Sequence, residues 1–174
     1  MHAKKIFYTA LTLVLLVTAF VITGVLAPEE YTGEINEQFS DTQKDMWRNL
    51  TSLEARKGRK PDVERISVIE EDRDGILWTE YLKNGKRRTL RIIEREIPNY
   101  FVIEIIQADN GLTGRWEYYL SQDEGIQKTN IKIKEKSYNT NLLLRAWHTV
   151  LGRSINLRRE VKSLRVSLFQ RLLR

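Results

Sequence analysis

The chain has 174 residues, of which 30% are charged and 41% hydrophobic, and its net charge is +6. This composition fits one globular domain with an appendage and is unlike that of a disordered chain. The sequence contains no cysteine, which excludes disulfides, thiol nucleophiles, iron–sulfur clusters and a lipid attached to cysteine. The two histidines, His2 and His148, lie far apart in the chain, so we expect no metal site and no cofactor.

The first long segment is apolar and carries no charge from residue 6 to residue 27. Its 22 residues exceed the roughly 20 that an α-helix needs to cross a bilayer. A cleaved signal peptide has an apolar core of only about 7–15 residues, and the one tolerable cleavage site here precedes Pro28. A buried core helix would need a polar face, which is missing. We therefore predict a transmembrane signal anchor over residues 1–28 and a folded domain over residues 29–174.

The charges flanking this segment predict its orientation. Lys4 and Lys5 precede it, and positive flanks tend to stay in the cytoplasm. The N-terminus is then cytoplasmic and the domain lies on the extracytoplasmic side. Residues 29–141 hold 19 basic and 22 acidic side chains, whereas residues 142–174 hold eight basic and one acidic. The positive charge therefore belongs to the C-terminal tail, which favours a membrane surface or an acidic partner over nucleic acid.

After the anchor, the pattern predicts an edge strand over residues 31–40 and a helix over residues 42–53. Residues 54–61 form a charged break that ends at Pro61. Apolar and polar residues then alternate between turn signals, the strongest of which is Asn84-Gly85. The predicted strands cover residues 63–71, 76–82, 88–97, 100–107, 113–120 and 126–137. Regular strands joined by tight turns predict an antiparallel meander.

The C-terminal segment predicts one helix from Asn141 to about Leu173. Its apolar seam consists of Leu143, Trp147, Val150, Leu157, Val161, Leu164, Leu168 and Leu172. A helix of this length spans close to 50 Å, so its last turns should overhang the domain. The element order predicts an α+β helix-grip fold, in which a curved antiparallel sheet wraps around a long C-terminal helix, preceded by one transmembrane helix.

Five short motifs in the domain resemble those of the SRPBCC superfamily, in particular its polyketide cyclase/dehydrase and lipid-transport branch. They lie at residues 47–51, 60–63, 96–102, 114–118 and 129–135. The resemblance implies a cavity for an apolar or amphipathic ligand such as a lipid, polyketide or isoprenoid. Family members often carry an aromatic residue near the position of Arg59, where this chain is basic. One wall of the cavity should therefore be more open or more polar.

The candidate cavity residues are apolar or aromatic side chains in inward phase, together with one carboxylate. They are Trp78, Glu80, Ile92, Ile103, Trp116, Tyr118, Ile131, Ile133 and Trp147. Each could instead be a plain core residue. The carboxylates Glu80, Glu94 and Glu135 could serve as a general acid or base, or could simply pair with arginines. No catalytic residue is assigned.

The C-terminal helix also carries basic residues beside a second apolar stripe. The candidate membrane contacts are Arg158, Arg159, Lys162, Arg165 and Phe169. The alternative is a solvated basic face. Three functions remain open: a membrane-anchored protein that binds a hydrophobic small molecule, a cyclase/dehydratase-type enzyme using a cavity Glu or Tyr, and a non-enzymatic module that docks a membrane or partner through its basic helix.

Overall fold

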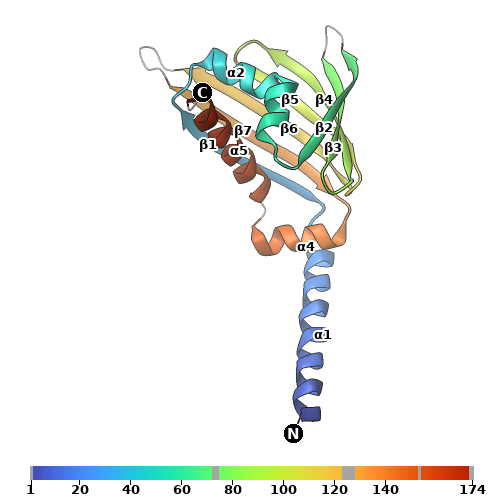
Figure 1. The fold of residues 1–174 in the computed structure, drawn as a ribbon. Coiled ribbons are helices and arrows are strands. Elements are labelled where there is room, and N and C mark those ends of the chain that lie inside the picture. Colours follow the sequence, from blue (N-terminus) through green and yellow to red (C-terminus); the bar gives the residue numbers. More distant parts are fainter. Residues whose placement is uncertain (1, 72–74, 123–127, 153, 173–174) are drawn as a thin grey trace.

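The computed structural model describes residues 2–71, 75–122, 128–152 and 154–172. A long N-terminal helix leads into a curved sheet that is covered on one face by shorter helices (Figure 1). The elements are α1 (His2–Leu26), β1 (Glu30–Phe39), α2 (Gln43–Thr51), α3 (Leu53–Arg59), β2 (Val63–Glu71), β3 (Ile76–Leu82), β4 (Arg87–Glu96), β5 (Tyr100–Ala108), β6 (Leu112–Gln122), β7 (Thr129–Asn139), α4 (Leu142–Leu151) and α5 (Ile155–Leu172).

The seven strands form one antiparallel sheet in the order β1-β7-β6-β5-β4-β3-β2. The predicted meander is confirmed, and the predicted edge strand pairs with β7. In β7, Ile131 and Ile133 face the core while Lys132 and Lys134 face outward, as their alternation requires. Gly85 adopts φ 79° in the tight turn between β3 and β4. The predicted turns at residues 72–74 and 123–125, and the start of the last predicted strand at residue 126, lie outside the described residues.

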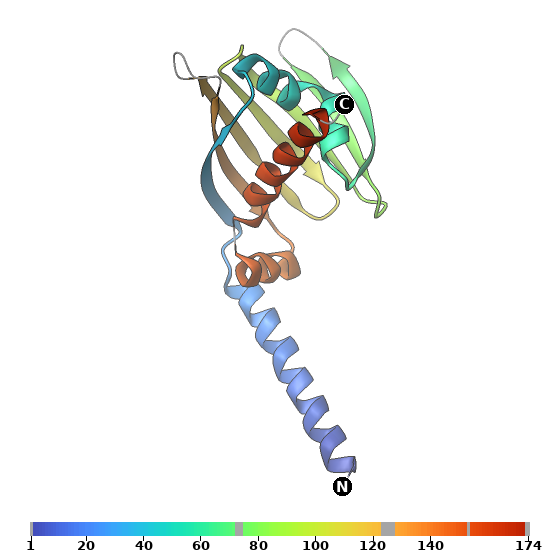
Figure 2. The same ribbon diagram turned by 60° about the vertical axis from the view of Figure 1, so that its left-hand side comes forward.

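Helices α2, α3 and α5 lie on the same face of the sheet (Figure 2). The core forms between these helices and the inward side chains of the strands. Its members include Met46, Leu50, Trp78, Leu90, Ile92, Phe101, Ile103, Tyr118, Ile131, Ile133, Leu157, Val161 and Leu164.

Two helix predictions are wrong. The charged segment 54–61 was expected to be a break, but residues Leu53–Arg59 form α3, whose first turn is capped by the Ser52 hydroxyl accepting a hydrogen bond from the Ala55 amide. The C-terminal segment is two helices and not one, because Gly152 adopts φ 91° at the end of α4. With 18 residues, α5 spans only about 27 Å, so the expected overhang of a 50 Å helix does not arise.

The predicted apolar seam is accordingly divided between two helices with different surroundings. Leu157 and Leu164 on α5 are fully buried against the sheet. On α4, in contrast, Leu143, Trp147 and Val150 are about half exposed or more, at 58%, 49% and 62%. Among the seam residues whose side chains the structure describes, only Leu157, Val161 and Leu164 of α5 therefore pack in the core against the sheet, and the side chains of Leu168 and Leu172 lie outside the described residues.

Helix α1 extends away from the sheet, and α4 lies across its C-terminal end in both views (Figures 1 and 2). Residues Lys4–Leu26 are long and apolar enough to span a membrane by length and composition, and only 6% of the most apolar window is buried within the protein. At Gly24 the two helices are so close that an added Cβ would lie 2.4 Å from the Leu142 carbonyl oxygen. Glycine at this position permits the contact between α1 and α4.

Candidate functional site

A cavity of about 520 Å³ lies between the sheet, α3 and α5. Residues of α3 and the segment after it form one side, strands β4 to β6 form the floor, and α5 forms the other side. The lining residues are Arg56, Arg59, Lys60, Pro61, Asp62, Arg88, Leu90, Ile103, Ile105, Leu112, Trp116, Tyr118, Asn156, Arg159, Glu160, Lys162, Ser163 and Val166. The floor is mostly apolar, whereas the residues of the two helical sides are mostly charged or polar. A cavity with an apolar floor and polar sides suits an amphipathic ligand.

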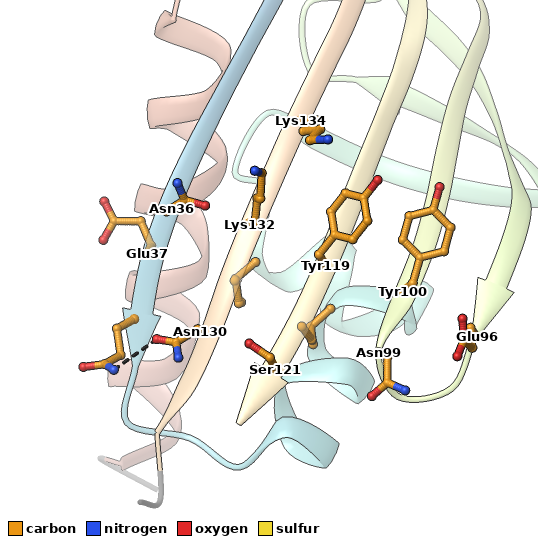
Figure 3. A pocket seen from close by; sticks show the side chains of 13 residues that line it. Asn36, Glu37, Glu96, Asn99, Tyr100, Tyr119, Ser121, Asn130, Lys132 and Lys134 are labelled. Carbon is orange, nitrogen blue, oxygen red and sulfur yellow. Dashed lines mark hydrogen bonds between the residues drawn. The ribbon is translucent and has the colours of Figure 1, made fainter. Parts of the chain in front are cut away.

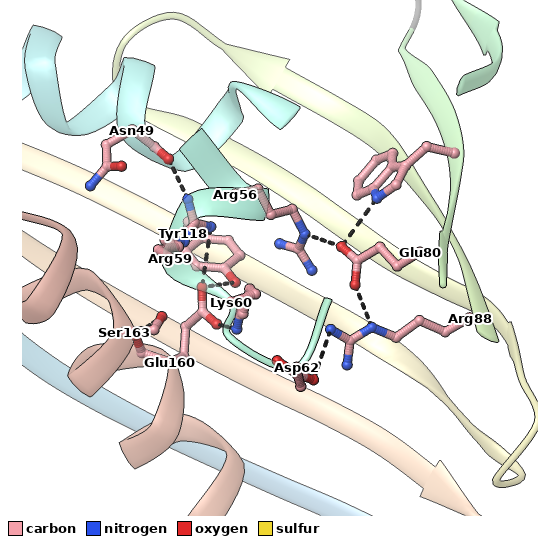
Figure 4. Close-up of polar contacts among 11 residues, drawn as sticks. Asn49, Arg56, Arg59, Lys60, Asp62, Glu80, Arg88, Tyr118, Glu160 and Ser163 are labelled. Carbon is pink, nitrogen blue, oxygen red and sulfur yellow. Dashed lines mark hydrogen bonds and ion pairs between the residues drawn. The ribbon is translucent and has the colours of Figure 1, made fainter. Parts of the chain in front are cut away.

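On the side of the cavity formed by α3, Glu80 is fully buried and holds two arginines (Figure 4). Its Oε1 accepts hydrogen bonds from Arg56 Nε and, at 3.2 Å, from Trp78 Nε1. Its Oε2 accepts a hydrogen bond from Arg88 Nε at 2.5 Å. Burial alone would raise the pKa of Glu80, but the two guanidinium groups lower it to about 2. Glu80 is therefore ionised at neutral pH.

On the side formed by α5, Glu160 is 2% exposed and forms a second cluster (Figure 4). One carboxylate oxygen accepts from Arg59 Nη2 at 3.4 Å and from the Tyr118 hydroxyl at 3.3 Å. The other accepts from Lys60 Nζ. Although burial opposes ionisation, the surrounding cations hold the pKa of Glu160 well below its usual range. This cluster joins α3, β6 and α5.

Three buried N–H donors of lining residues have no hydrogen-bond acceptor in the part of the chain that the structure describes. They are Nη1 of Arg56, Nε of Arg59 and Nε1 of Trp116. The Arg56 side chain is only 7% exposed, and the charge of Glu80 raises its pKa despite the opposing effect of burial. A buried donor without a partner costs about 1–3 kcal/mol. Each is a candidate donor to a ligand in the cavity.

One end of the cavity lies near the place where α1 and α4 meet the sheet. Leu112 lines the cavity and also borders a small recess formed with Ala27, Pro28 and Arg145, where α1 and α4 meet the sheet. Asn156, in the first turn of α5, lines the same end. The cavity therefore lies at the end of the sheet nearest α1.

A second, open depression of about 990 Å³ lies on the opposite face of the sheet (Figure 3). It crosses β1, β7, β6 and β5 and displays Tyr100, Tyr119, Lys132 and Lys134. Its lining consists mostly of polar side chains on the face of the sheet away from α2, α3 and α5. It resembles a solvated strand surface more than an enclosed site.

Three of the candidate cavity residues, Ile103, Trp116 and Tyr118, line the cavity. Glu80 lies behind its wall, bonded to the lining residues Arg56 and Arg88. Four others pack in the hydrophobic core and do not line it: Trp78, Ile92, Ile131 and Ile133. Trp147 was placed wrongly, because it lies on α4, which the break at Gly152 separates from the helix facing the sheet.

The other two candidate carboxylates differ in their surroundings. Glu94 lies on the solvent side, where it binds Arg115. Glu135 is 2% exposed and accepts hydrogen bonds from the Ser137 hydroxyl at 3.0 Å and from Asn156 Nδ2 at 3.3 Å. Burial raises the pKa of Glu135 to about 7. Glu135 does not line the cavity, although its partner Asn156 does.

The basic residues predicted to touch a membrane all lie on α5. Arg159 and Lys162 line the cavity, and Arg165 forms an ion pair with Glu37 of β1. Arg158 donates to the Leu151 carbonyl oxygen at 3.4 Å. The side chain of Phe169 lies outside the described residues. Helix α5 runs from α4 away from the end of α1 (Figure 1). Its basic face therefore does not lie beside the C-terminal end of α1, where α4 lies.

Sequence reasoning missed Arg56, Lys60 and Glu160 as site residues. Arg56 and Lys60 lie in the segment 54–61, which was predicted to be a charged break. Glu160 carried a usable signal, because it is the one acidic residue among positions 142–174 and falls three residues after the buried Leu157. The basic position expected to make one wall more open or more polar, Arg59, is 3% exposed and makes that wall polar.

The arrangement of sheet and helices recurs in solved structures. An aromatase/cyclase, Zhui from Streptomyces sp. R1128, superposes with a TM-score of 0.65 at 11% identity, covering 81% of this chain and 93% of that one. The chain has the helix-grip fold. A START superfamily protein from Mycobacterium smegmatis matches with a TM-score of 0.61 at 9% identity, covering 80% of this chain and 97% of that one.

A third helix-grip structure, norcoclaurine synthase from Thalictrum flavum in complex with dopamine and hydroxybenzaldehyde, has a TM-score of 0.60 at 10% identity and covers 86% of this chain and 91% of that one. No protein-family model and no curated protein matches the sequence. The helix-grip similarity at these identities concerns the fold, and the function has to be argued from the cavity itself.

Proposed function

We propose that the chain is a membrane-anchored protein that binds a hydrophobic or amphipathic small molecule, such as a lipid, polyketide or isoprenoid, between the sheet and α5. The observation that carries this proposal is the cavity of about 520 Å³, with its apolar floor and its position at the end of the sheet nearest α1. The volume lies within the range of about 300–1,000 Å³ that small-molecule sites occupy. Solved structures of the same fold include a cyclase and a ligand-bound synthase.

A cyclase or dehydratase reaction receives less support. Glu80 is held by two arginines and is ionised, so it has no proton to donate. Glu135 has a raised pKa but lies outside the cavity lining. Tyr118 reaches the cavity, where its hydroxyl donates to Glu160, and burial raises its pKa well above 10. General acid–base catalysis needs a group within hydrogen-bond reach of the substrate and a pKa near the working pH.

Native mass spectrometry of the full chain, purified in detergent from its native host, tests the binding function. We expect a co-purifying small molecule in the unmodified protein. The variant Ile105→Trp places an indole in the cavity and should reduce the bound fraction at least about tenfold. Ile106→Trp is the matched control, because Ile106 is the next residue on β5 and is 44% exposed on the other face. Absence of any bound species from the unmodified protein would contradict the proposal.

We further propose that α1 spans a membrane, with residues 1–28 as the anchor and Lys4 and Lys5 on the cytoplasmic side. Helix α4 would then lie flat in the headgroup region, on the extracytoplasmic side. It contains no acidic residue, and it exposes Leu143, Trp147 and Val150 beside the end of α1. Tryptophan is enriched at this level of the bilayer, and an exposed apolar helical face is stabilised there.

Quenching of tryptophan fluorescence by brominated phospholipids tests the position of α4. With the full chain in nanodiscs, we expect brominated acyl chains to quench Trp147, one of four tryptophans, and therefore about a quarter of the emission. Trp147→Phe should abolish the quenching, since Trp47, Trp78 and Trp116 lie in the sheet domain. If the unmodified protein shows no quenching, α4 does not lie in the membrane interface.

A further inference from the structure

The charges around the cavity are not balanced. Six described lining residues are cationic, namely Arg56, Arg59, Lys60, Arg88, Arg159 and Lys162. The acidic lining residues are Asp62 and Glu160, and the buried Glu80 behind the wall adds a third negative charge. A surplus of three positive charges therefore surrounds the cavity. Cations gathered at a partly desolvated site attract an anion more strongly than cations on an open surface.

The buried ion pairs do not use all the donors at this site. Glu80 already accepts from three side chains, and Glu160 also accepts from three. Nη1 of Arg56 and Nε1 of Trp116 nevertheless have no acceptor within the described ranges. Both residues line the cavity, Arg56 from α3 and Trp116 from β6. An anionic group would satisfy donors of this kind with charge-assisted hydrogen bonds.

We propose that the ligand is an anionic amphiphile whose carboxylate or phosphate head accepts hydrogen bonds from Arg56 and Trp116. Its apolar tail lies on the floor formed by Leu90, Ile103 and Ile105. This inference rests on the proposed binding function and names the chemistry of its ligand. A cationic ligand would add to the positive surplus, and a neutral one would leave it uncompensated.

Calorimetric titration with three probes of equal chain length tests the proposal. Dodecanoate, dodecanol and dodecylammonium are titrated into the full chain in nanodiscs, and titrations into empty nanodiscs are subtracted. We expect dodecanoate to bind at least about tenfold more tightly than dodecanol, as charge-assisted hydrogen bonds permit, and dodecylammonium to bind no better than background. Dodecyl phosphate distinguishes the sources of the anion, because tighter binding than dodecanoate indicates a phosphorylated lipid and weaker binding a fatty acid.

Variants that leave the fold intact locate the head group. Trp116→Phe keeps an aromatic ring but removes the N–H, and it should weaken dodecanoate binding about tenfold and change dodecanol binding less than about twofold. Lys162→Gln removes an exposed cation at the cavity and should weaken dodecanoate binding about threefold at low salt. Lys57→Gln, an exposed cation of α3 that does not line the cavity, is its control and should have no effect.

Failure of the anionic-ligand proposal and failure of the proposed binding function would give different results. If dodecanol binds as tightly as dodecanoate, or if dodecylammonium binds more tightly than either, the ligand is not an anion and the binding function stands. If none of the three probes binds, both the anionic ligand and the proposed function are overturned.

Discussion

Replacement of Glu160 by alanine is expected to lower the free energy of unfolding by about 3–5 kcal/mol. The carboxylate is 2% exposed and is the shared partner of Arg59, Lys60 and Tyr118. Its loss leaves two buried cations without a counter-charge, which is far more costly than the loss of a solvated ion pair. Denaturant unfolding of the full chain in detergent, followed by circular dichroism, measures the difference.

Glu54→Ala is the control for this variant, because Glu54 is an exposed acidic residue of α3 in the same part of the fold. We expect it to change the free energy of unfolding by no more than about 0.5 kcal/mol. A loss below about 1 kcal/mol for Glu160→Ala would mean that the buried cations find other partners or water, and that this cluster does not hold α3 to α5.

Replacement of Glu135 by glutamine is expected to change how stability depends on pH. Burial raises the pKa of the folded-state carboxyl from 4.5 to about 7, so the folded protein holds a proton that the unfolded chain releases. Stability from this group is therefore complete below about pH 4.5, falls as the pH rises, and is fully lost above about pH 7. The total change is about 3 kcal/mol. Glutamine cannot ionise and should remove it.

We therefore expect Glu135→Gln to be more stable than the unmodified chain by about 2–3 kcal/mol at pH 8 and nearly equal to it at pH 4.5. Thermal unfolding of both proteins from pH 4.5 to pH 8 measures the difference. Burial lowers the pKa of His148, but this residue is common to both proteins. Parallel curves for the two proteins would show that Glu135 is ionised in the folded state throughout.

The stability that Glu80 and Glu160 contribute changes with pH in the opposite direction. Their folded-state pKa values lie below that of the unfolded chain, so their contribution is present above about pH 4.5 and is lost as the pH falls toward 2. The comparison of Glu135→Gln with the unmodified chain is therefore made above this window.

The sheet could be predicted closely from the sequence because each strand has its own alternation and its own turn signal. Ile131 and Ile133 alternate with lysines, and Asn84-Gly85 marks a hairpin, so register and order follow from local patterns. The regions around Pro61 and Gly152 show where local sequence patterns do not predict the structure. Proline at the end of 54–61 indicated where a helix had to stop but not that α3 precedes it. Gly152 lies inside an apolar periodicity that continues unbroken on both sides.

The site was harder to predict from the sequence, because its residues bind partners that are distant in the chain. Arg56 lies 24 residues from Glu80, and Lys60 lies 100 residues from Glu160. Taken by itself, the sequence of α3 resembles a run of charged residues exposed to solvent. Only the meeting of α3 with α5 over the sheet makes Arg59 a buried residue. Which aromatic side chains border a cavity and which fill the core, as for Trp116 and Trp78, depends on the curvature of the sheet, which alternation does not encode.

The close contact at Gly24 limits how the domain can move. Only residues 27–29 separate α1 from β1, a stretch of at most about 10 Å, and α4 is seated on the end of α1 where Gly24 meets Leu142. A domain held in this way cannot swing through solvent on a tether. If α1 spans a bilayer, the cavity keeps a fixed height and tilt above it. If the proposed ligand binding holds as well, the ligand exchanges with the leaflet in which α1 is anchored or with a neighbour in the same membrane, and is not shuttled between compartments.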